Sequence, residues 1–157
     1  MQKVSLFIDV QNIYYTTKNT FNCNFDYNKF WALATSNRTV EHAFAYAIDR
    51  GDEKQKQFQN ILRAIGFEVK LKPYIQRLDG SSKGDWDVGI AIDMIEHCKN
   101  SDVAVLASGD GDFDILVQKI QDKYEIPVEV YGVRALTSST LIDAASVYYP
   151  IERSLLL

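Results

Sequence analysis

Short apolar runs rich in valine, isoleucine and phenylalanine alternate along this chain with stretches whose apolar residues recur at helical spacing. An uninterrupted run of this kind is typical of a strand buried on both faces of a sheet. The predicted strands span residues 4–9, 42–49, 67–75, 102–108 and 126–132. The run at 67–75 alternates instead, with Lys70 and Lys72 on one side, which indicates a half-exposed strand at an edge of the sheet.

The stretches between these runs predict helices, which span residues 27–36, 52–66, 85–98, 111–124 and 138–146. The helix at 52–66 is the clearest, because its apolar residues share one face and Gly66 ends it. The helix at 85–98 is expected to bury the apolar face formed by Val88, Ala91, Ile92 and Ile95. Strands that alternate with helices predict an α/β fold, in which helices cover both faces of a parallel sheet.

Length and composition fit one domain. A chain of 157 residues, 46% of them hydrophobic, can bury a sizeable core, and the sequence shows no repeat or interdomain linker. Residues 1–157 are therefore expected to form a single domain. Cys23 and Cys98 form no CxxC pair, which favours buried thiols over a disulfide or a zinc site. No apolar run is long enough to span a bilayer, so we expect no membrane association and a cytoplasmic location.

Charge narrows the range of partners. The 21 acidic and 17 basic residues give a net charge of -4, which argues against nucleic-acid binding through bulk positive charge. Basic residues nevertheless concentrate between residues 50 and 83, so the net charge conceals a local basic region. Tyr14, Tyr15 and Trp86 could stack on unpaired bases, as proteins usually hold single-stranded RNA, or they could pack in the core.

Acidic side chains gather at the predicted carboxyl ends of two strands. Asp9 ends the first strand, and Asp110 and Asp112 follow the strand at 102–108 in the stretch SGDGDFDILV. In open parallel sheets, ligands bind beyond these ends, where the strand order reverses. If the two strands are neighbours, their carboxylates converge on one crevice. Asp87 could join them, because the loop before its helix emerges on the same side.

Carboxylates at such close range repel one another, so they require either protonation or a counter-cation. Oxygen ligands without a converging histidine or cysteine select Mg²⁺ or Mn²⁺. The matching chemistry is metal-assisted hydrolysis of a phosphodiester. Asn12 would orient the attacking water or a phosphate through its amide, and Lys83 would neutralise a neighbouring phosphate.

Structural roles remain open for these residues. Asp110 or Asp112 could simply cap the helix that follows them, because aspartate is a favoured N-cap. Asn12 could shape the turn after the first strand, and Lys83 could be a solvated loop residue.

Other polar residues are expected to lie outside the crevice. Asp93 lies about 240° around its helix from Asp87, so we expect it to be solvated or to pair with a nearby lysine. His42 and His97 are isolated in the sequence. They are expected to lie far apart, in packing or surface roles.

The stretch at 109–114 resembles the start of two other motifs, a dinucleotide-binding loop and an EF-hand, but neither motif is complete. A dinucleotide-binding loop would have glycine where Asp114 stands, and its carboxylates would face a pyrophosphate. A calcium-binding EF-hand would have glycine in place of Ile115 and glutamate in place of Gln121. Neither function is therefore predicted.

Three stretches carry a resemblance to a known family: FIDVQN in the first strand, KGDWDVGIAIDM in the middle helix and VLASGDGDFDILV after the later strand. Together they resemble the NYN domain family, specifically its LabA-like branch within the PIN-like nuclease superfamily. The match runs in order from residue 3 to about residue 146.

This resemblance implies a three-layer α/β/α sandwich around a parallel sheet of order 3-2-1-4-5, and metal-dependent endoribonuclease activity. The positions that match the family's acidic and supporting residues are Asp9, Asn12, Asp87, Ser108, Asp110 and Asp112. One departure concerns the middle helix, where an extra residue follows Gly84, so that Asp85 competes with Asp87 for the family's acidic position.

The sequence thus predicts a ribonuclease that uses Mg²⁺ or Mn²⁺, with Asp9, Asp87, Asp110 and Asp112 as metal ligands and single-stranded RNA as substrate. The alternative is a catalytically inactive module that binds RNA or a protein partner in a regulatory role. The apolar tail at 154–157 would suit a homodimer contact, or it would pack against its own domain.

Overall fold

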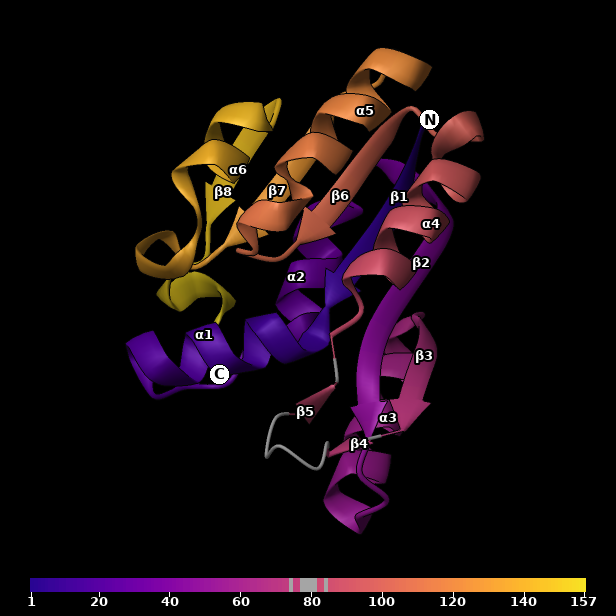
Figure 1. Ribbon diagram of the computed structural model, residues 1–157. Coiled ribbons are helices and arrows are strands. Elements are labelled where there is room, and N and C mark those ends of the chain that lie inside the picture. The colour runs from indigo at the N-terminus through magenta and orange to yellow at the C-terminus, as the bar shows by residue number, and fades with distance from the viewer. Residues whose placement is uncertain (74, 77–81, 84) are drawn as a thin grey trace.

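The computed structural model describes residues 1–73, 75–76, 82–83 and 85–157, and its centre is a six-stranded parallel sheet (Figure 1). The strands are β1 (Gln2–Asp9), β2 (Arg38–Asp49), β3 (Glu68–Pro73), β6 (Val103–Ala107), β7 (Val128–Gly132) and β8 (Val147–Pro150). Their spatial order is β3-β2-β1-β6-β7-β8, so the first five have the predicted order 3-2-1-4-5, with β3 at an edge. β8 was not predicted, and it adds a sixth strand beside β7.

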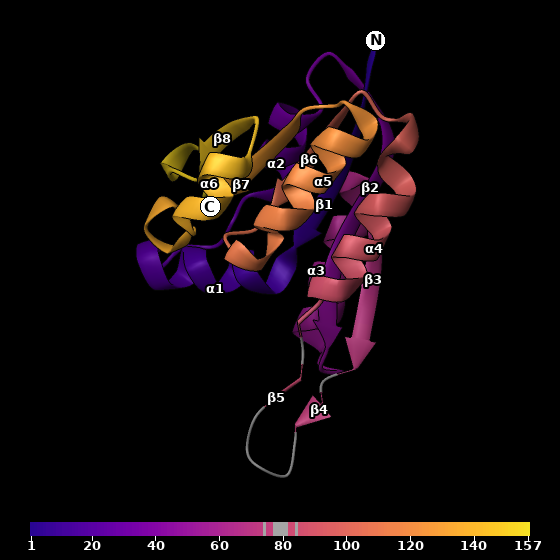
Figure 2. The same cartoon turned by 45° about the horizontal axis from the view of Figure 1, so that its top comes forward.

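Helices cover both faces of the sheet (Figures 1 and 2). One face packs against α2 (Tyr27–Ala34) and α3 (Glu53–Ile65). The other face packs against α4 (Asp87–His97), α5 (Asp114–Tyr124) and α6 (Ser139–Ala144). α1 (Val10–Phe21) begins where β1 ends and runs across the carboxyl end of the sheet. The three-layer sandwich predicted from the sequence is therefore confirmed.

Shorter elements connect these layers. β4 (Ile75–Gln76) and β5 (Ser82–Lys83) form an antiparallel pair between β3 and α4. The 3-10 turns are η1 (Cys98–Asn100), η2 (Gly111–Phe113), η3 (Arg134–Leu136) and η4 (Arg153–Leu155). Among the helices of the described residues, none combines the length and apolar character that crossing a bilayer requires.

The buried face of α4 differs from the predicted one. Ile90, Met94 and Cys98 are buried against the sheet and α5, whereas Val88 is 70% and Ile92 is 56% exposed. The predicted face is therefore wrong. Apolar residues occur on every side of this helix, so spacing alone does not select the side that packs.

Threonine occupies two of the buried positions of α1, Thr16 and Thr17. The hydroxyls of Thr16 and Thr17 donate to the carbonyl oxygens of Asn12 and Ile13, at 2.8 and 2.7 Å. These bonds within the helix satisfy hydroxyl groups that would otherwise be buried without partners. The helix can therefore present a polar side chain to the core at little cost.

The apolar carboxyl-terminal tail packs against its own chain. Leu155 and Leu156 are buried, and the Leu155 carbonyl accepts a hydrogen bond from the Asp26 N–H at 2.8 Å. The Leu157 N–H donates to the Asn24 carbonyl at 2.9 Å. Of the two alternatives for this segment, packing on its own domain is the one observed.

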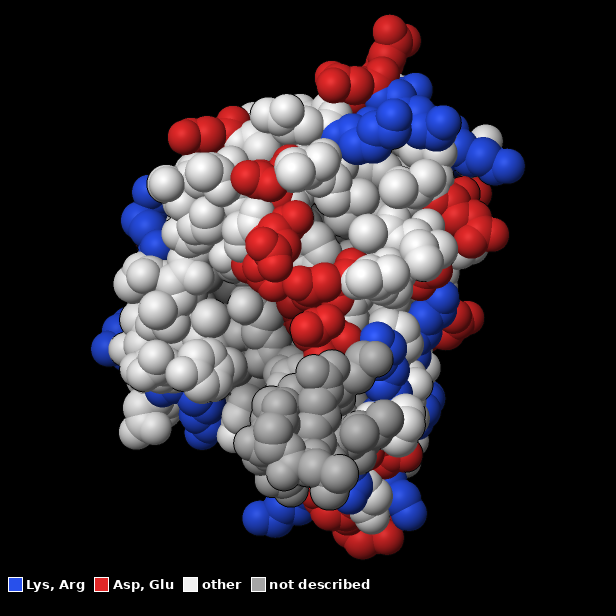
Figure 3. Space-filling view, viewed as in Figure 1, with Lys and Arg blue, Asp and Glu red and all other residues white. Residues whose placement is uncertain are grey.

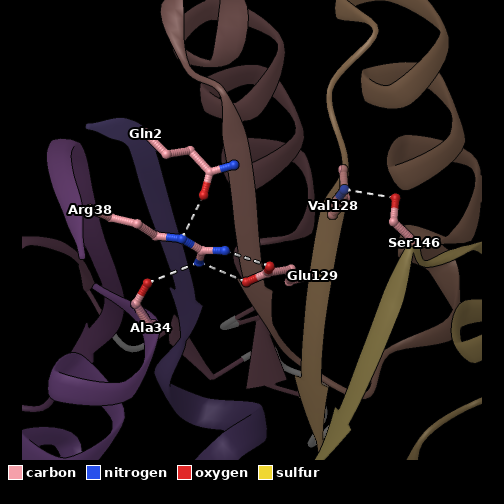
Figure 4. Close-up of polar contacts among 6 residues, drawn as sticks. All are labelled: Gln2, Ala34, Arg38, Val128, Glu129 and Ser146. Atoms are coloured by element: carbon pink, nitrogen blue, oxygen red, sulfur yellow. Dashed lines mark hydrogen bonds and ion pairs between the residues drawn. The ribbon is translucent and has the colours of Figure 1, made fainter. Parts of the chain in front are cut away.

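An ion pair spans the sheet at the amino-terminal end of the strands (Figure 4). The Arg38 guanidinium donates to both carboxylate oxygens of Glu129, at 2.9 and 2.8 Å, and also to Gln2 and to the carbonyl of Ala34. β1 and β6 lie between the two strands that carry this pair. The pair therefore links four strands and the end of α2 at the edge opposite the carboxyl ends.

Candidate metal centre

Asp9 lies at the junction of β1 and α1, and only 6% of it is exposed. Its side chain caps α1 by accepting the Asn12 N–H at 3.4 Å, and it accepts the Ser108 hydroxyl at 3.0 Å. Burial raises the pKa of Asp9 to about 6, against the effect of these two hydrogen bonds, and the charges of Asp110 and Asp85 raise it further. Asp9 is thus a carboxylate held in place and short of compensating charge.

The turn after β6 brings the next acids beside Asp9. β1 and β6 are parallel neighbours with Ile8 opposite Ala107, so Ser108 follows directly beside Asp9. The Asp110 N–H donates to the buried Ser108 hydroxyl at 3.2 Å, and the Asp110 carboxylate accepts the Asp112 N–H at 2.9 Å. Asp110 therefore caps the η2 turn and also faces the crevice.

Asn12 joins the two strand ends. Its side-chain oxygen accepts the Gly109 N–H at 2.9 Å, which leaves the donor half of the amide out of this bond. A β-carbon at Gly109 would lie 2.7 Å from the Leu136 carbonyl oxygen, so the turn is packed too closely for any side chain there. Asn12 therefore shapes the turn, and its NH₂ group remains available to the crevice that it lines.

Asp87, the first residue of α4, completes the acidic group. Carboxylate oxygens of Asp87, Asp110 and Asp112 all lie within 4.8 Å of one another. Burial raises the pKa of Asp87 to about 7, and a hydrogen bond with Asp110 and the neighbouring negative charges contribute to the increase. Without a cation, this group keeps a proton near neutral pH.

These residues surround a cavity of about 320 Å³, which we call the acidic crevice; its walls are formed by Asp9, Gln11, Asn12, Tyr15, Asp85, Asp87 and Asp110. Figure 3 shows a continuous band of acidic side chains across this face, over the starts of α4 and α5. Three segments that are distant in the sequence therefore supply the carboxylates. Sequence reasoning missed Gln11, whose one signal was its place two residues after Asp9 at the start of a helix.

Asp85 and Asp87 both line the acidic crevice, but they are held differently. Asp87 belongs to the close group with Asp110 and Asp112, whereas Asp85 is exposed and lies outside that group. The Lys72 ammonium donates to the Asp85 carbonyl oxygen at 3.0 Å and so secures its backbone rather than its carboxylate. This geometry favours Asp87 over Asp85 as the ligand.

The aromatic residues named from the sequence divide into two groups. Tyr14 and Tyr15 are 58% and 65% exposed, and Tyr15 lines the acidic crevice. Trp86 is half-buried: its indole N–H donates to the Ala47 carbonyl at 2.8 Å, and its ring packs 5.3 Å from that of Tyr46. Trp86 therefore anchors the start of α4, whereas the two tyrosines face solvent.

Two lysines and Asp93 remain to be placed. Asp93 accepts the Lys70 ammonium at 2.6 Å and the Tyr46 hydroxyl at 2.7 Å, which confirms it as a partner of a lysine. The backbone of Lys83 lies in β5, but its side chain is outside the described residues, so its predicted contact with a phosphate stays a prediction.

The donors of the acidic crevice suit a small, hard cation. Every ionisable side chain in its wall is a carboxylate or a tyrosine, and no histidine or cysteine lies among the lining residues of the described chain. Carboxylate oxygens at this spacing are the donors that Mg²⁺ and Mn²⁺ prefer, and such ions keep open positions for water and phosphate. Burial, together with repulsion from neighbouring carboxylates, raises the pKa values of Asp9 and Asp87, and the charge of a divalent ion would offset both effects.

A parallel α/β/α sandwich with carboxylates beyond the carboxyl ends of β1 and β6 is the architecture of PIN-like domains. The model of the NYN domain family matches residues 3–152, and the chain belongs to this family.

Individual proteins are similar to this chain to different degrees. The low amplitude and bright protein LabA of Synechococcus elongatus is 26% identical over 158 residues, covering 96% of this chain and 84% of that protein. A crystal structure of a Vibrio parahaemolyticus protein of unknown function has a TM-score of 0.95 and 54% identity, covering 99% of this chain and 96% of the other. Ribokinase from Giardia lamblia, with a TM-score of 0.52 and 14% identity over 82% of this chain and 46% of that chain, shares the fold alone.

Proposed function

We propose that this protein is an endoribonuclease that depends on Mg²⁺ or Mn²⁺ and hydrolyses RNA phosphodiester bonds. The observation that carries the proposal is the convergence of Asp9, Asp87, Asp110 and Asp112 from three segments. Membership of the NYN domain family supports a nuclease-type or RNA-related role. The four aspartates would be the metal ligands.

The side chains around the proposed metal site would have different roles. A bound divalent ion supplies electrophilic stabilisation of the phosphoryl oxygens and lowers the pKa of a water. Ser108 holds the Asp9 carboxylate by the hydroxyl bond of 3.0 Å, so it acts as a positioning residue. The NH₂ group of Asn12, which makes no hydrogen bond to the described residues, would orient a phosphate oxygen or the attacking water. Asp9, which is buried at the end of β1, would hold the ion at this end of the sheet.

Single-stranded RNA is the substrate that best suits the rim of the acidic crevice. Tyr14 and Tyr15 expose their rings on α1, and aromatic rings hold unpaired bases by stacking. The acidic band would repel phosphates unless cations neutralise it, so substrate binding should itself require the metal (Figure 3). Lys83 is proposed to contact a phosphate from β5.

The test is cleavage of labelled single-stranded RNA with and without Mn²⁺, by the wild type and by Asp112→Asn. The wild type should cut only with metal, and the variant should lose about a hundredfold in rate while it keeps its fold, because it lacks one ligand. Asp122→Asn is the matched control, since Asp122 is, like Asp112, an exposed aspartate, but it lies outside the close group of Asp87, Asp110 and Asp112. Mn²⁺ should raise the melting temperature of the wild type and of the control more than that of Asp112→Asn.

The same experiment separates an enzyme from a regulatory binding module. If the wild type binds Mn²⁺ and RNA but cuts none of a varied set of RNAs, the proposed hydrolysis is wrong. The protein is then better described as a catalytically inactive module that binds RNA in a regulatory role. If Asp112→Asn cuts as fast as Asp122→Asn, the assignment of the ligands is wrong.

A further inference from the structure

A second group of potential ligands lies at the other end of α4. Asp93, Glu96 and His97 each offer one donor atom, and these atoms lie within 4.8 Å of one another. Asp93 and His97 are four residues apart on the helix, a spacing that places two metal ligands on one face. α4 begins at Asp87, so about 9 Å of helix separates Asp93 from the acidic crevice, and about 15 Å separates His97 from it.

His42 of β2 lies beside this group. Its ring centroid is 4.6 Å from that of His97, and the two planes are inclined by 54°. The expectation that the two histidines lie far apart is therefore wrong. Two imidazoles bound to one tetrahedral zinc ion place their ring centres about 5 Å apart, because each Zn–N bond is about 2 Å long.

The rings of both histidines are oriented by their neighbours. The Phe44 ring stacks on His42 at 5.6 Å and lies 5.2 Å from His97. Asp93 is also positioned, because Lys70 and Tyr46 both donate to its Oδ2 atom, so neither uses Oδ1. Ligands held in this way by a surrounding shell lose less freedom when an ion binds.

We propose that Asp93, Glu96 and His97 form a binding site for a borderline divalent ion such as Zn²⁺, separate from the acidic crevice, and that the neighbouring His42 ring turns toward the ion as a fourth ligand. The donor atoms of the first three already lie within 4.8 Å of one another, whereas those of His42 lie outside this group. Imidazole nitrogens with carboxylate oxygens select Zn²⁺ and its neighbours in the first transition series over Mg²⁺. Glu96 is exposed and the other three are half-buried, so an ion can enter from solvent. A bound ion would tie the end of α4 to β2, and it would thereby stabilise the layer that carries Asp87.

The direct test is titration of chelator-treated protein with Zn²⁺ in excess Mg²⁺, which occupies the acidic crevice. The chain has two histidines, so spectra selective for imidazole nitrogens report on this site alone. One equivalent of Zn²⁺ should shift the resonances of both histidines together. Zn²⁺ that binds without moving the imidazole resonances, or the absence of binding at micromolar concentrations, would overturn the proposal.

Variants measure the contribution of each element. His97→Gln and His42→Gln should each weaken Zn²⁺ affinity by about tenfold or more. Asp112→Asn should leave it unchanged, as should Glu152→Gln, an exposed acid beyond β8 at the opposite sheet edge. Equal affinity in both histidine variants and the wild type would refute the site. Loss of RNA cleavage in Asp112→Asn has no bearing on it, so the two proposals fail independently.

Discussion

Asp9 is the residue whose position is hardest to explain by structure alone. A buried carboxylate costs free energy unless charge or hydrogen bonds compensate it. Two hydrogen bonds reach Asp9, yet its pKa is still raised to about 6, which shows that they do not offset its burial. A protein that needed only a helix cap here could place a neutral side chain at this position. The ionised, buried carboxylate of Asp9 therefore lowers the stability of the metal-free protein, and a bound cation would compensate its charge.

Asp9→Asn should stabilise the metal-free protein at high pH. The folded state binds the Asp9 proton more tightly than the unfolded state, since the pKa rises from 3.8 to about 6. Well below pH 3.8 both states are protonated and the variant should match the wild type. As the pH rises from about 4 through 6, the wild type loses stability, and at pH 8 the variant should exceed it by on the order of 3 kcal/mol.

Urea unfolding at pH 4 and pH 8, with and without Mn²⁺, measures this effect. With Mn²⁺ at pH 8 the order should reverse, because the ion stabilises the ionised wild type and binds the variant more weakly. The control is Asp52→Asn, which changes an exposed N-cap of α3 and should show no such pH dependence. A difference between Asp9→Asn and the wild type that is the same at pH 4 and pH 8 would contradict the argument.

At the scale of elements, the sequence was informative where local pattern and tertiary packing agree. The apolar runs of β1 and β6 are buried along nearly their whole length, and both end at the edge where the acids were expected. The convergence of Asp9 and Asp110 followed from these strand ends on the condition that β1 and β6 are neighbours, an order that only the family resemblance implied. Asp87 was preferred to Asp85 only through the family resemblance, because local pattern does not show how the start of α4 is anchored.

Other features depend on contacts that no local pattern contains. The buried side of α4 is set by the sheet and α5, and Val88 and Ile92 would have served equally well by spacing. The proximity of His42 and His97 arises because the end of α4 packs over β2. β8 is short and alternates between exposed and half-buried residues, so it gave too little signal to be separated from a turn.

Gly89→Ala tests how α4 is anchored. Alanine normally stabilises a helix over glycine by about 1 kcal/mol. Here a β-carbon at Gly89 would lie 2.5 Å from the Trp86 ring, which is held by the Ala47 carbonyl and Tyr46. The variant should therefore lose about 1–3 kcal/mol of unfolding free energy, and its Mn²⁺ affinity should fall as Asp87 moves.

Calorimetry for Mn²⁺ and urea unfolding give the two measurements. Ile92→Ala, an exposed change on the same helix, should leave Mn²⁺ affinity unchanged. A stabilised Gly89→Ala protein with unaltered affinity would show that Trp86 can move aside, and that it does not fix the position of Asp87.

At the scale of the whole molecule, the two ends of the sheet differ in whether their buried carboxylates are paired with a cationic side chain. At the carboxyl end the carboxylates are concentrated and lack cationic partners within the acidic crevice, where the lining residues are described (Figure 3). At the amino end, Glu129 is almost fully buried but receives two hydrogen bonds from Arg38 (Figure 4). One end therefore has its buried charge paired, whereas the carboxylates of the other end have no cationic partner among the described lining residues.

This contrast predicts that the Arg38–Glu129 pair stabilises the sheet without contributing to the site. Arg38→Met leaves the Glu129 carboxylate buried without its partner, so it should lower the unfolding free energy by about 3 kcal/mol. Glu129→Gln should cost less, because the amide still accepts a hydrogen bond from the guanidinium. Combining Arg38→Met with Glu129→Leu should recover much of the loss, because no charge then remains in the core.

The measurement is a double-mutant cycle by urea unfolding over Arg38→Met, Glu129→Leu and their combination, with Mn²⁺ affinity and RNA cleavage determined on the folded fraction of each variant. A coupling free energy of about 1 kcal/mol or more is expected, because both partners are mostly buried and doubly hydrogen-bonded. Mn²⁺ affinity should stay constant, since the full length of the strands separates this pair from Asp9. A coupling near zero would mean that Glu129 finds other partners. A fall in Mn²⁺ affinity would mean that strain at one end of the sheet reaches the other.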